Sequence, residues 1–324
     1  MSAASGSVAL ITGITGQDGS YLAESLLADG VEVHGTTRGG DSVDRFRGWL
    51  DDRADAVVLH TVGEPIDYAA LLARIAPTAI YHLAGQTHVG RSFEAPLETL
   101  DANARGTLAL LEAVRRSPRR DAIRLVNASS AAVFGSAPHP QTEATPLAPA
   151  SPYACSKAYA QLQTAMHRGT YGLHASSVIL YNHESPRRGP AFVTRKIARA
   201  AAAISLGCED GLTLGSLDVG RDWGHARDFV HAMRLVAAAD TPDDYIIATG
   251  TYHTLADLLD LAFGHVGLDW AGLVRQDPAL IRPDDDSRLQ GDASKIRERL
   301  GWVPRTTLAG LVAEMVDAEL AALR

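Results

Sequence analysis

The sequence predicts an α/β protein built on a doubly wound parallel sheet, with a smaller lobe in its C-terminal half. Three observations lead to this prediction. Apolar runs alternate with amphipathic stretches over residues 8–181, which is the pattern of a parallel sheet covered by helices on both faces. The first run leads directly into a glycine-rich turn. After Tyr181 the alternation gives way to polar segments rich in arginine, proline and acidic residues, which favour a second lobe closing over a ligand.

The sheet is expected to consist of short apolar runs, with helical patterns between them. The first strand is residues 8–12, and the helix after it, residues 20–28, has leucines at helical spacing. Later strands are predicted at residues 32–36, 56–59, 79–83, 124–128 and 175–181. Two longer stretches, residues 97–115 and 153–168, are predicted to be helices.

The composition is that of a globular protein with a large core. The chain has 324 residues, of which 46% are hydrophobic, so its length favours two lobes. A formal net charge of -8 provides no uniform basic field, so we expect no nucleic-acid partner. Two cysteines exclude a disulfide framework and a Cys-rich zinc site, and they are typical of a reducing cytoplasm. No apolar stretch approaches the roughly 20 residues that span a membrane, so we expect a cytoplasmic protein without a membrane partner or a metal.

The glycine-rich turn predicts a dinucleotide site. Thr12-Gly13-x-x-Gly16-x-x-Gly19 follows the first strand and opens a helix, where glycines let the backbone approach a pyrophosphate and the helix N-terminus favours its negative charge. The predicted cofactor contacts are Gly13, Thr15, Gly16, Gln17, Asp18 and Gly19, joined by Leu83, Ala84 and Gly85 after another strand. Asn103 and Gly106 are predicted to start and line the helix that follows. Arg38 follows the second strand, where an NAD site usually has an acidic residue, and this favours the 2'-phosphate of NADP.

Three further residues come in the order that proton-coupled hydride transfer requires. Ser130 ends the Ser129-Ser130 pair after the fifth strand, and Tyr153 and Lys157 follow one helical turn apart, which places both on one helix face. A nearby ammonium lowers the pKa of a phenol, so Tyr153 is expected to take a proton from a sugar hydroxyl while hydride leaves the same carbon. Ser130 is expected to hold that oxygen.

Long segments of the chain resemble the extended short-chain dehydrogenase/reductases, and most closely the GDP-mannose 4,6-dehydratases and their relatives. The segments that carry the resemblance are ALITGITGQDGSYLAESLL, HLAGQTHVGRSFEAP, SPYACSKAYA, NHESPRRGPAFVTRKI, LGSLDVGRDWGHARDFV, IIATGTYHTLADL and LQGDASKIRERLGWVPR. The resemblance implies a Rossmann domain with a tightly bound NAD or NADP, over residues 1–181 and 222–250. It implies a nucleotide-sugar-binding lobe over residues 182–221 and 251–324, and a homodimer or higher oligomer paired through the helices at 97–115 and 153–168.

The resemblance also implies a GDP-sugar substrate and a set of contacts to it. Arginine forks match phosphate oxygens and supply local positive charge that the acidic chain as a whole lacks. The substrate contacts implied are His88, Asn182, Arg187, Val193 and Lys196 around the nucleotide and sugar, Arg221 and Arg282 at the diphosphate, and Asp285 near the ribose.

The chain departs from the dehydratase pattern at one chemically decisive position. The dehydratase loop after the fifth strand reads roughly Ser-Thr-Ser-Glu-Leu-Tyr-Gly, and its glutamate exchanges the protons needed to expel water. This chain has Ser129-Ser130-Ala131-Ala132-Val133-Phe134-Gly135, so Ala132 replaces the glutamate. The loop instead resembles that of UDP-galactose 4-epimerases. Gly39, the Gly63-Glu64-Pro65 segment and Asp285 are further departures at the cofactor and ribose contacts.

These observations lead to a hypothesis of function with three alternatives. The leading hypothesis is a GDP-sugar 4-epimerase that acts on a manno-configured GDP-hexose or GDP-heptose by transient oxidation at C4. The alternatives within the family are a GDP-4-keto-6-deoxysugar reductase and a true 4,6-dehydratase whose acid is relocated to His88 or Glu184. The alternative of another class is a non-catalytic nucleotide-binding protein, against which the intact Ser130, Tyr153 and Lys157 argue.

Overall fold

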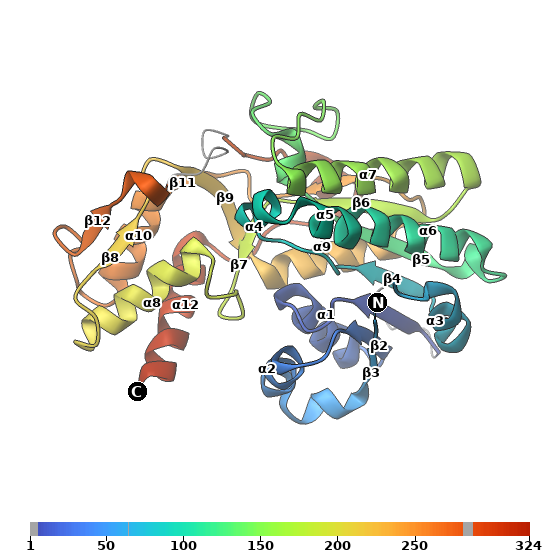
Figure 1. Cartoon of the computed structure of the whole chain (residues 1–324), viewed down its shortest axis with the longest axis horizontal. Helices are drawn as coiled ribbons and strands as arrows, with labels where there is room; N and C mark the ends of the chain where they lie inside the picture. The colour runs from blue at the N-terminus through green and yellow to red at the C-terminus, as the bar shows by residue number, and fades with distance from the viewer. Residues whose placement is uncertain (1–5, 64, 281–287) are drawn as a thin grey trace.

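A computed structural model describes residues 6–63, 65–280 and 288–324 of the chain (Figure 1). In this described part, a parallel sheet of seven strands has the order β10-β6-β5-β4-β1-β2-β3. Its strands are β1 (Val8–Thr12), β2 (Glu32–Thr37), β3 (Val57–Thr61), β4 (Ala79–His82), β5 (Arg124–Ser130), β6 (Ala175–Leu180) and β10 (Tyr245–Ile247). The strand order reverses between β1 and β4, which is the point where doubly wound sheets bind ligands. The predicted fold class is confirmed.

Helices cover both faces of this sheet because neighbouring residues of a strand point to opposite sides. Leu10 packs among apolar residues of α3 and α6, whereas the next residue, Ile11, packs among those of α1 and α9. On the first face lie α3 (Tyr68–Ile75), α6 (Gly106–Arg116) and α7 (Pro152–Tyr171), with the short helices α4 (Val89–Glu94) and α5 (Pro96–Leu100) beside α7. On the other face lie α1 (Gln17–Ala28), α2 (Asp41–Leu50) and α9 (Ala226–Ala238).

One of the predicted helices is interrupted. The helix expected over residues 97–115 begins as α5, widens into a π-helical turn over Asp101–Arg105 and continues as α6. Asn103 lies in the wide turn, and its side chain bonds to groups outside the helix. Isolated π-helical turns of this kind occur often at functional sites.

The second lobe has an apolar core of its own, contributed by α8 (Val193–Ser205), α10 (Leu255–His265) and α12 (Leu308–Leu323). Figure 1 shows this lobe beside the sheet domain, with the C-terminus at the end of α12. Within the described residues, β8 (Leu212–Leu214) and β12 (Val274–Gln276) form a two-stranded sheet, and β7 (Asn182–Glu184), β9 (Gly220–His225) and β11 (Tyr252–Thr254) form a three-stranded one. The order of this last sheet is β11-β9-β7, and its strands carry the chain between the two lobes.

The segment after residue 287 crosses back to the sheet domain. Leu289, Ile296 of α11 (Ser294–Leu300) and Trp302 are buried in the same core as α1 and α9. The indole nitrogen of Trp302 donates a hydrogen bond to the Asp228 carbonyl oxygen, 2.9 Å away. The packing therefore places this segment on the sheet domain, although the predicted boundary assigns it to the smaller lobe.

Among the described residues, no helix combines the length and the apolar character that crossing a lipid bilayer requires.

Candidate active site

The glycine-rich turn lies at the carboxyl end of β1, against the loop that follows β4. Gly13 has a φ of +71°, which favours glycine, and a Cβ atom added there would lie 2.9 Å from the Ala84 Cα. A Cβ atom added at Gly19, in the first turn of α1, would lie 2.6 Å from the Ile14 Cα. The Thr12 hydroxyl accepts a hydrogen bond from the Ala84 amide at 3.1 Å. The two predicted cofactor loops are thus in direct contact, and Gly13 lies where they meet, at a position that leaves no room for a side chain.

Asn103 ties the second of these loops to α7. Its side-chain oxygen accepts a hydrogen bond from the Gln86 amide at 2.8 Å, and its amide group donates to the Gln86 carbonyl oxygen and to the Ser156 hydroxyl, each at 3.0 Å. The π-helical turn around Asn103 places the side chain where it can make all three bonds. Asn103 therefore joins the loop after β4 to α7 through contacts within the protein.

The three predicted catalytic residues lie together. Tyr153 and Lys157 are buried in the first turns of α7, whose N-terminus is capped by the Ser151 hydroxyl bonded to the Ala154 amide. The Ser130 hydroxyl, at the carboxyl end of β5, is close enough to the Tyr153 phenol to act on its pKa. The geometry brings a phenol, a hydroxyl and an amine to the carboxyl edge of the sheet, next to the predicted dinucleotide site.

The electrostatics of Tyr153 differ from the sequence-based expectation. Burial raises the pKa of the Tyr153 phenol, and the Ser130 hydroxyl and the Arg188 charge oppose that rise without overcoming it. The Lys157 ammonium donates to the Ala128 carbonyl oxygen, 2.9 Å away, and burial lowers its pKa to about 8. The expectation that Lys157 lowers the pKa of Tyr153 is therefore wrong for the protein by itself, because burial dominates the phenol and the amine is bonded to the backbone.

A charged pair that the sequence analysis missed lies beside these residues. His183 Nε2 is 2.8 Å from Asp18 Oδ2, and His183 Nδ1 is 2.7 Å from the Tyr181 carbonyl oxygen. Both partners of the ring are acceptors, so both ring nitrogens carry protons and the imidazole is a cation. Arg188 also acts electrostatically on Tyr153 and Asp18. His183 and Arg188 both belong to the NHESPRRG segment, whose charge density is the signal that could have identified them.

Arg187, the neighbouring arginine, reaches away from the lobe toward α1. Its guanidinium bonds to Glu24 at 2.8 Å and to the Ser20 hydroxyl and the Trp49 carbonyl oxygen at 3.1 Å each. It also stacks 4.0 Å from the Tyr21 ring centroid. The substrate contact expected for Arg187 stays a prediction, and these bonds give the side chain a different role, joining the second lobe to the dinucleotide domain.

The remaining predicted contacts lie around the same edge of the sheet or beyond it. Gly16 and Thr15 lie in the glycine turn, Gln17 and Asp18 begin α1, and the exposed Arg38 follows β2. Leu83 and Gly85 flank Ala84 in the loop after β4. Asn182 begins β7, Val193 begins α8, Lys196 is exposed on α8, Arg221 lies on β9, and the exposed His88 caps α4 through its ring nitrogen. Arg282 and Asp285 lie outside the described residues.

Ala132 lies close to the Ser130 hydroxyl. It is half-buried in the turn after β5, and its amide donates to the Ser130 hydroxyl oxygen at 3.2 Å. A side chain at this position therefore starts within a few bonds of Ser130, and here that side chain is a methyl group.

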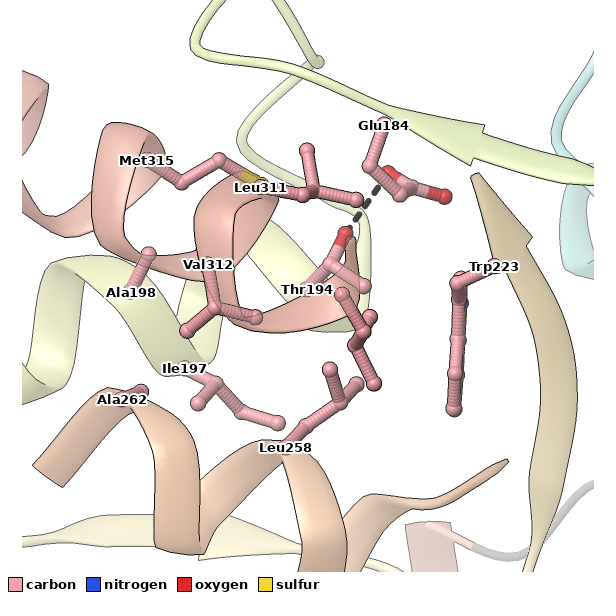
Figure 2. Close-up of a pocket in the computed structure, with 11 residues that line it drawn as sticks. Glu184, Thr194, Ile197, Ala198, Trp223, Leu258, Ala262, Leu311, Val312 and Met315 are labelled. Atoms are coloured by element: carbon pink, nitrogen blue, oxygen red, sulfur yellow. Dashed lines mark hydrogen bonds between the residues drawn. The ribbon is translucent and has the colours of Figure 1, made fainter. Parts of the chain in front are cut away.

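Glu184 is committed to other partners. Figure 2 shows its carboxylate at the edge of an apolar pocket formed by side chains of α8, α10 and α12, hydrogen-bonded to Thr194. The Thr194 hydroxyl donates at 2.7 Å, and Arg188 Nε lies 2.9 Å from the same carboxylate oxygen. His88 likewise uses its Nδ1 to accept a bond from the Arg91 amide at 3.1 Å. Both residues considered as a relocated acid are thus already bonded within the protein.

The fold and the site define an extended short-chain dehydrogenase/reductase, an enzyme with a Ser-Tyr-Lys constellation at the switch point of a Rossmann sheet. A family model described as GDP-mannose 4,6 dehydratase matches residues 10–315, and the chain belongs to that family. "GDP-mannose 4,6 dehydratase 1" of Arabidopsis thaliana is 46% identical over 323 residues, covering 97% of this chain and 90% of that relative. "GDP-mannose 4,6-dehydratase" of Sinorhizobium fredii is 43% identical, covering 98% and 97%.

Solved structures show the same fold. A Thermus thermophilus UDP-glucose 4-epimerase in complex with NAD is 27% identical, with a TM-score of 0.83 over 97% of this chain and 99% of that one. RMD from Pseudomonas aeruginosa, complexed with NADPH, is 23% identical, with a TM-score of 0.79 over 98% and 99% of the two chains. At that level of identity the second likeness is one of fold.

Proposed function

We propose that this protein is a GDP-sugar 4-epimerase that acts on a manno-configured GDP-hexose or GDP-heptose by transient oxidation at C4. One observation carries the proposal. Ser130, Tyr153 and Lys157 lie together, whereas the position at which the dehydratase pattern has its glutamate is Ala132, beside Ser130. The groups needed for chemistry at C4 are retained, and the group needed to remove water from C5 and C6 is absent.

The residues at the switch point fit a dinucleotide. Gly13 and Gly19 keep the turn free of side chains, and the N-terminus of α1 presents backbone amides to a pyrophosphate. The cofactor proposed is tightly bound NAD or NADP, with Arg38 as the contact that favours the 2'-phosphate. When bound, it would accept hydride from C4 and return it to the opposite face of the sugar.

The protein's own groups manage the proton. Tyr153, as phenolate, takes the proton of the C4 hydroxyl as hydride leaves that carbon, and it returns the proton to the C4 oxygen when hydride comes back. Ser130 holds the same oxygen. Lys157 brings positive charge close to the loop around Gly85, where the cofactor is proposed to bind. After oxidation the 4-keto sugar must rotate so that hydride can return to its opposite face. Arg221 and Arg282 are proposed to hold the diphosphate firmly, while the sugar itself is held loosely.

The second candidate is a GDP-mannose 4,6-dehydratase. Relatives more than 40% identical over nearly the whole chain bear that name, which favours it. It requires an acid/base group in place of the missing glutamate, and neither Glu184 nor His88 is free of protein partners. A reductase of GDP-4-keto-6-deoxysugars would use the same Tyr153 and Lys157 but would consume reduced cofactor.

A homodimer is part of the proposal. Large apolar side chains are exposed on neighbouring helices of one face: Phe93 on α4, Leu97 and Leu100 on α5, and Leu162 and Met166 on α7. Leu97 is 74% exposed and Leu162 58% exposed. Exposed apolar side chains gathered on neighbouring helices are typical of an interface, and a second copy of the same face would cover them. Light scattering should give the mass of a dimer or a multiple of it, and a monomeric mass would contradict the arrangement.

Product analysis tests the function. Purified protein is incubated with a panel of GDP- and UDP-sugars, and the products are identified by NMR and mass spectrometry. An epimer at C4 with unchanged mass and no net consumption of cofactor supports the epimerase. Loss of one water shows the dehydratase. Stoichiometric oxidation of NADPH with a 4-keto sugar shows the reductase, and binding without turnover shows a non-catalytic protein.

A further inference from the structure

The loop over residues 186–188 is held from the second lobe by a single arginine. Arg195, in the first turns of α8, donates hydrogen bonds from one guanidinium nitrogen to the Pro186 carbonyl oxygen at 2.6 Å and to the Arg188 carbonyl oxygen at 2.8 Å. A guanidinium fork can bind two acceptors at once in fixed geometry. The backbone of the loop is therefore fixed at both ends by one side chain.

Arg195 is in turn fixed by the C-terminal helix. Its Nε donates to the carboxylate of Glu319, a residue of α12 that is only 3% exposed. Arg199, one turn further along α8, also approaches Glu319, at 3.9 Å, but it is half-exposed and its other ion pair is with Glu209 at 3.8 Å. A buried carboxylate needs a positive partner, and the tight contact is the one with Arg195.

The loop held in this way carries Arg188. Arg188 is fixed on two sides, by the Glu184 carboxylate 2.9 Å from its Nε and by the Phe192 ring, whose centroid is 3.5 Å from its guanidinium carbon. Its charge acts on both Tyr153 and Asp18. Glu184 is itself held in place, because the Thr194 hydroxyl of α8 donates a hydrogen bond to its carboxylate at the edge of the lobe's apolar core (Figure 2).

We propose that Arg195 and Glu319 are positioning residues for the reaction: through the backbone of residues 186–188, the C-terminal helix sets the place of the Arg188 guanidinium, whose charge acts on Tyr153. Neither residue touches the reacting atoms. The inference rests on the proposed role of Tyr153 in catalysis, and it adds the means by which the second lobe acts on that tyrosine. A displacement of Arg188 by about 1 Å is enough to matter, because misplacements of that size commonly cost on the order of 100-fold in rate.

The dependence of the reaction rate on pH should depend on the position of Arg188. The groups that act on the Tyr153 phenol are Ser130, Arg188 and Asp18, whose partner is His183. Lys157, one helical turn further along α7, is bonded to the Ala128 carbonyl oxygen. Arg188 is the cation whose charge stabilises the phenolate, so moving it away raises the pKa of Tyr153 further. The step in which Tyr153 acts as base should then require a higher pH.

The experiment compares Arg195→Gln and Glu319→Gln with the matched control Arg199→Gln. In the Arg195 variant we expect kcat to fall on the order of 100-fold with little change in KM. We also expect the rising limb of its pH–rate profile to lie at higher pH than in the wild type. Glu319→Gln should lower kcat by about 10-fold and move the rising limb of the pH–rate profile in the same direction. Arg199→Gln should leave kcat and the pH–rate profile unchanged. Equal effects of the Arg195 and Arg199 variants, or a normal kcat and pH profile for Arg195→Gln in a folded protein, would overturn the proposal.

A second measurement is independent of turnover and of which sugar is used. Ultraviolet difference titration of each protein against its own Tyr153→Phe derivative isolates the ionisation of the Tyr153 phenol. Its midpoint should lie at higher pH in the Arg195→Gln background than in the wild type, and an unchanged midpoint contradicts the positioning role. If product analysis shows a product other than a C4 epimer while this shift is present, the proposed function fails and the positioning inference stands.

Discussion

The Lys157 ammonium donates a hydrogen bond to the Ala128 carbonyl oxygen, 2.9 Å away, so this amine is tied to the backbone of β5. The side chain is only 6% exposed, and burial lowers its pKa from 10.5 to about 8. The amine is thus held at the carboxyl end of the sheet at a cost in stability, because the charged form is disfavoured inside the protein.

This cost predicts how the stability of a Lys157→Met variant depends on pH. The unfolded chain holds the proton up to about pH 10.5 and the folded chain only to about pH 8, so wild-type stability rises between these values. The variant lacks that rise. Denaturant unfolding should show the wild type gaining about 3 kcal/mol relative to Lys157→Met across this range. A difference that does not vary with pH would mean that Lys157 is not desolvated, and turnover should be lost at every pH.

Tyr153→Phe removes the phenol while leaving the ring in place. General acid/base groups contribute about 100- to 10,000-fold in rate, and we expect a loss of at least that order with cofactor affinity nearly unchanged. Steady-state kinetics and cofactor titration check both parts. Tyr159→Phe is the matched control, because Tyr159 lies on the same helix but is 39% exposed. Near-normal turnover of the Tyr153 variant would remove this residue from the mechanism.

Ala132→Glu tests whether one carboxylate separates the two reactions. The residue follows Ser130 by two positions and its amide contacts the Ser130 hydroxyl, so a carboxylate there can reach the reacting sugar. We expect a product lighter by one water to form alongside or in place of the C4 epimer, measured by mass spectrometry. Ala132→Gln has the same shape but cannot exchange a proton, and it should give no dehydrated product. Dehydration by the wild type would show instead that a relocated acid is present.

The Asp18–His183 pair predicts a pH window for stability. Burial alone would raise the pKa of Asp18 and lower that of His183, but the mutual attraction and hydrogen bond outweigh burial, so the pKa of Asp18 is lowered and that of His183 is raised. The contribution of the pair is full between the ordinary values of 3.8 and 6.5. It is lost as pH rises through the raised pKa of His183, and also as pH falls through the lowered pKa of Asp18.

Asp18→Asn should therefore be less stable than the wild type by about 3 kcal/mol within that window, because it leaves a buried cation without its counter-charge. The deficit should shrink as the pH is raised above 6.5. Chemical unfolding at a series of pH values measures it. A deficit that stays constant up to alkaline pH would show that His183 is neutral in the native state.

The nucleotide preference is a separate prediction. We expect GDP to compete better than UDP for the site, because the NHESPRRG and RDWGHA segments resemble those of GDP-sugar enzymes and a purine offers more stacking area. Displacement of a labelled GDP-sugar by each nucleotide measures this. Equal or stronger displacement by UDP would overturn the substrate class.

The sequence by itself determined the features that depend on neighbouring residues. Strands β1 to β6 lie within two or three residues of their predicted positions, because apolar runs bounded by turn residues fix them locally. Helix geometry places Tyr153 and Lys157 on one helix face because they are four residues apart. The sequence also shows directly that residue 132 is an alanine and has no carboxylate.

Only the tertiary structure decided which distant groups meet. It pairs Asp18 with His183 across 165 residues and turns Arg187 toward Glu24 across 163, and it brings Trp302 back to the main core. It also widens the helix at Asn103, where bonds to Gln86 and Ser156 outweigh the regular pattern. The spacing of apolar residues in a helix or strand is set by the backbone geometry of adjacent residues. The contacts between distant residues depend instead on the order of the strands in the sheet and on burial. Strand order decides which side chains meet, and burial changes their pKa values.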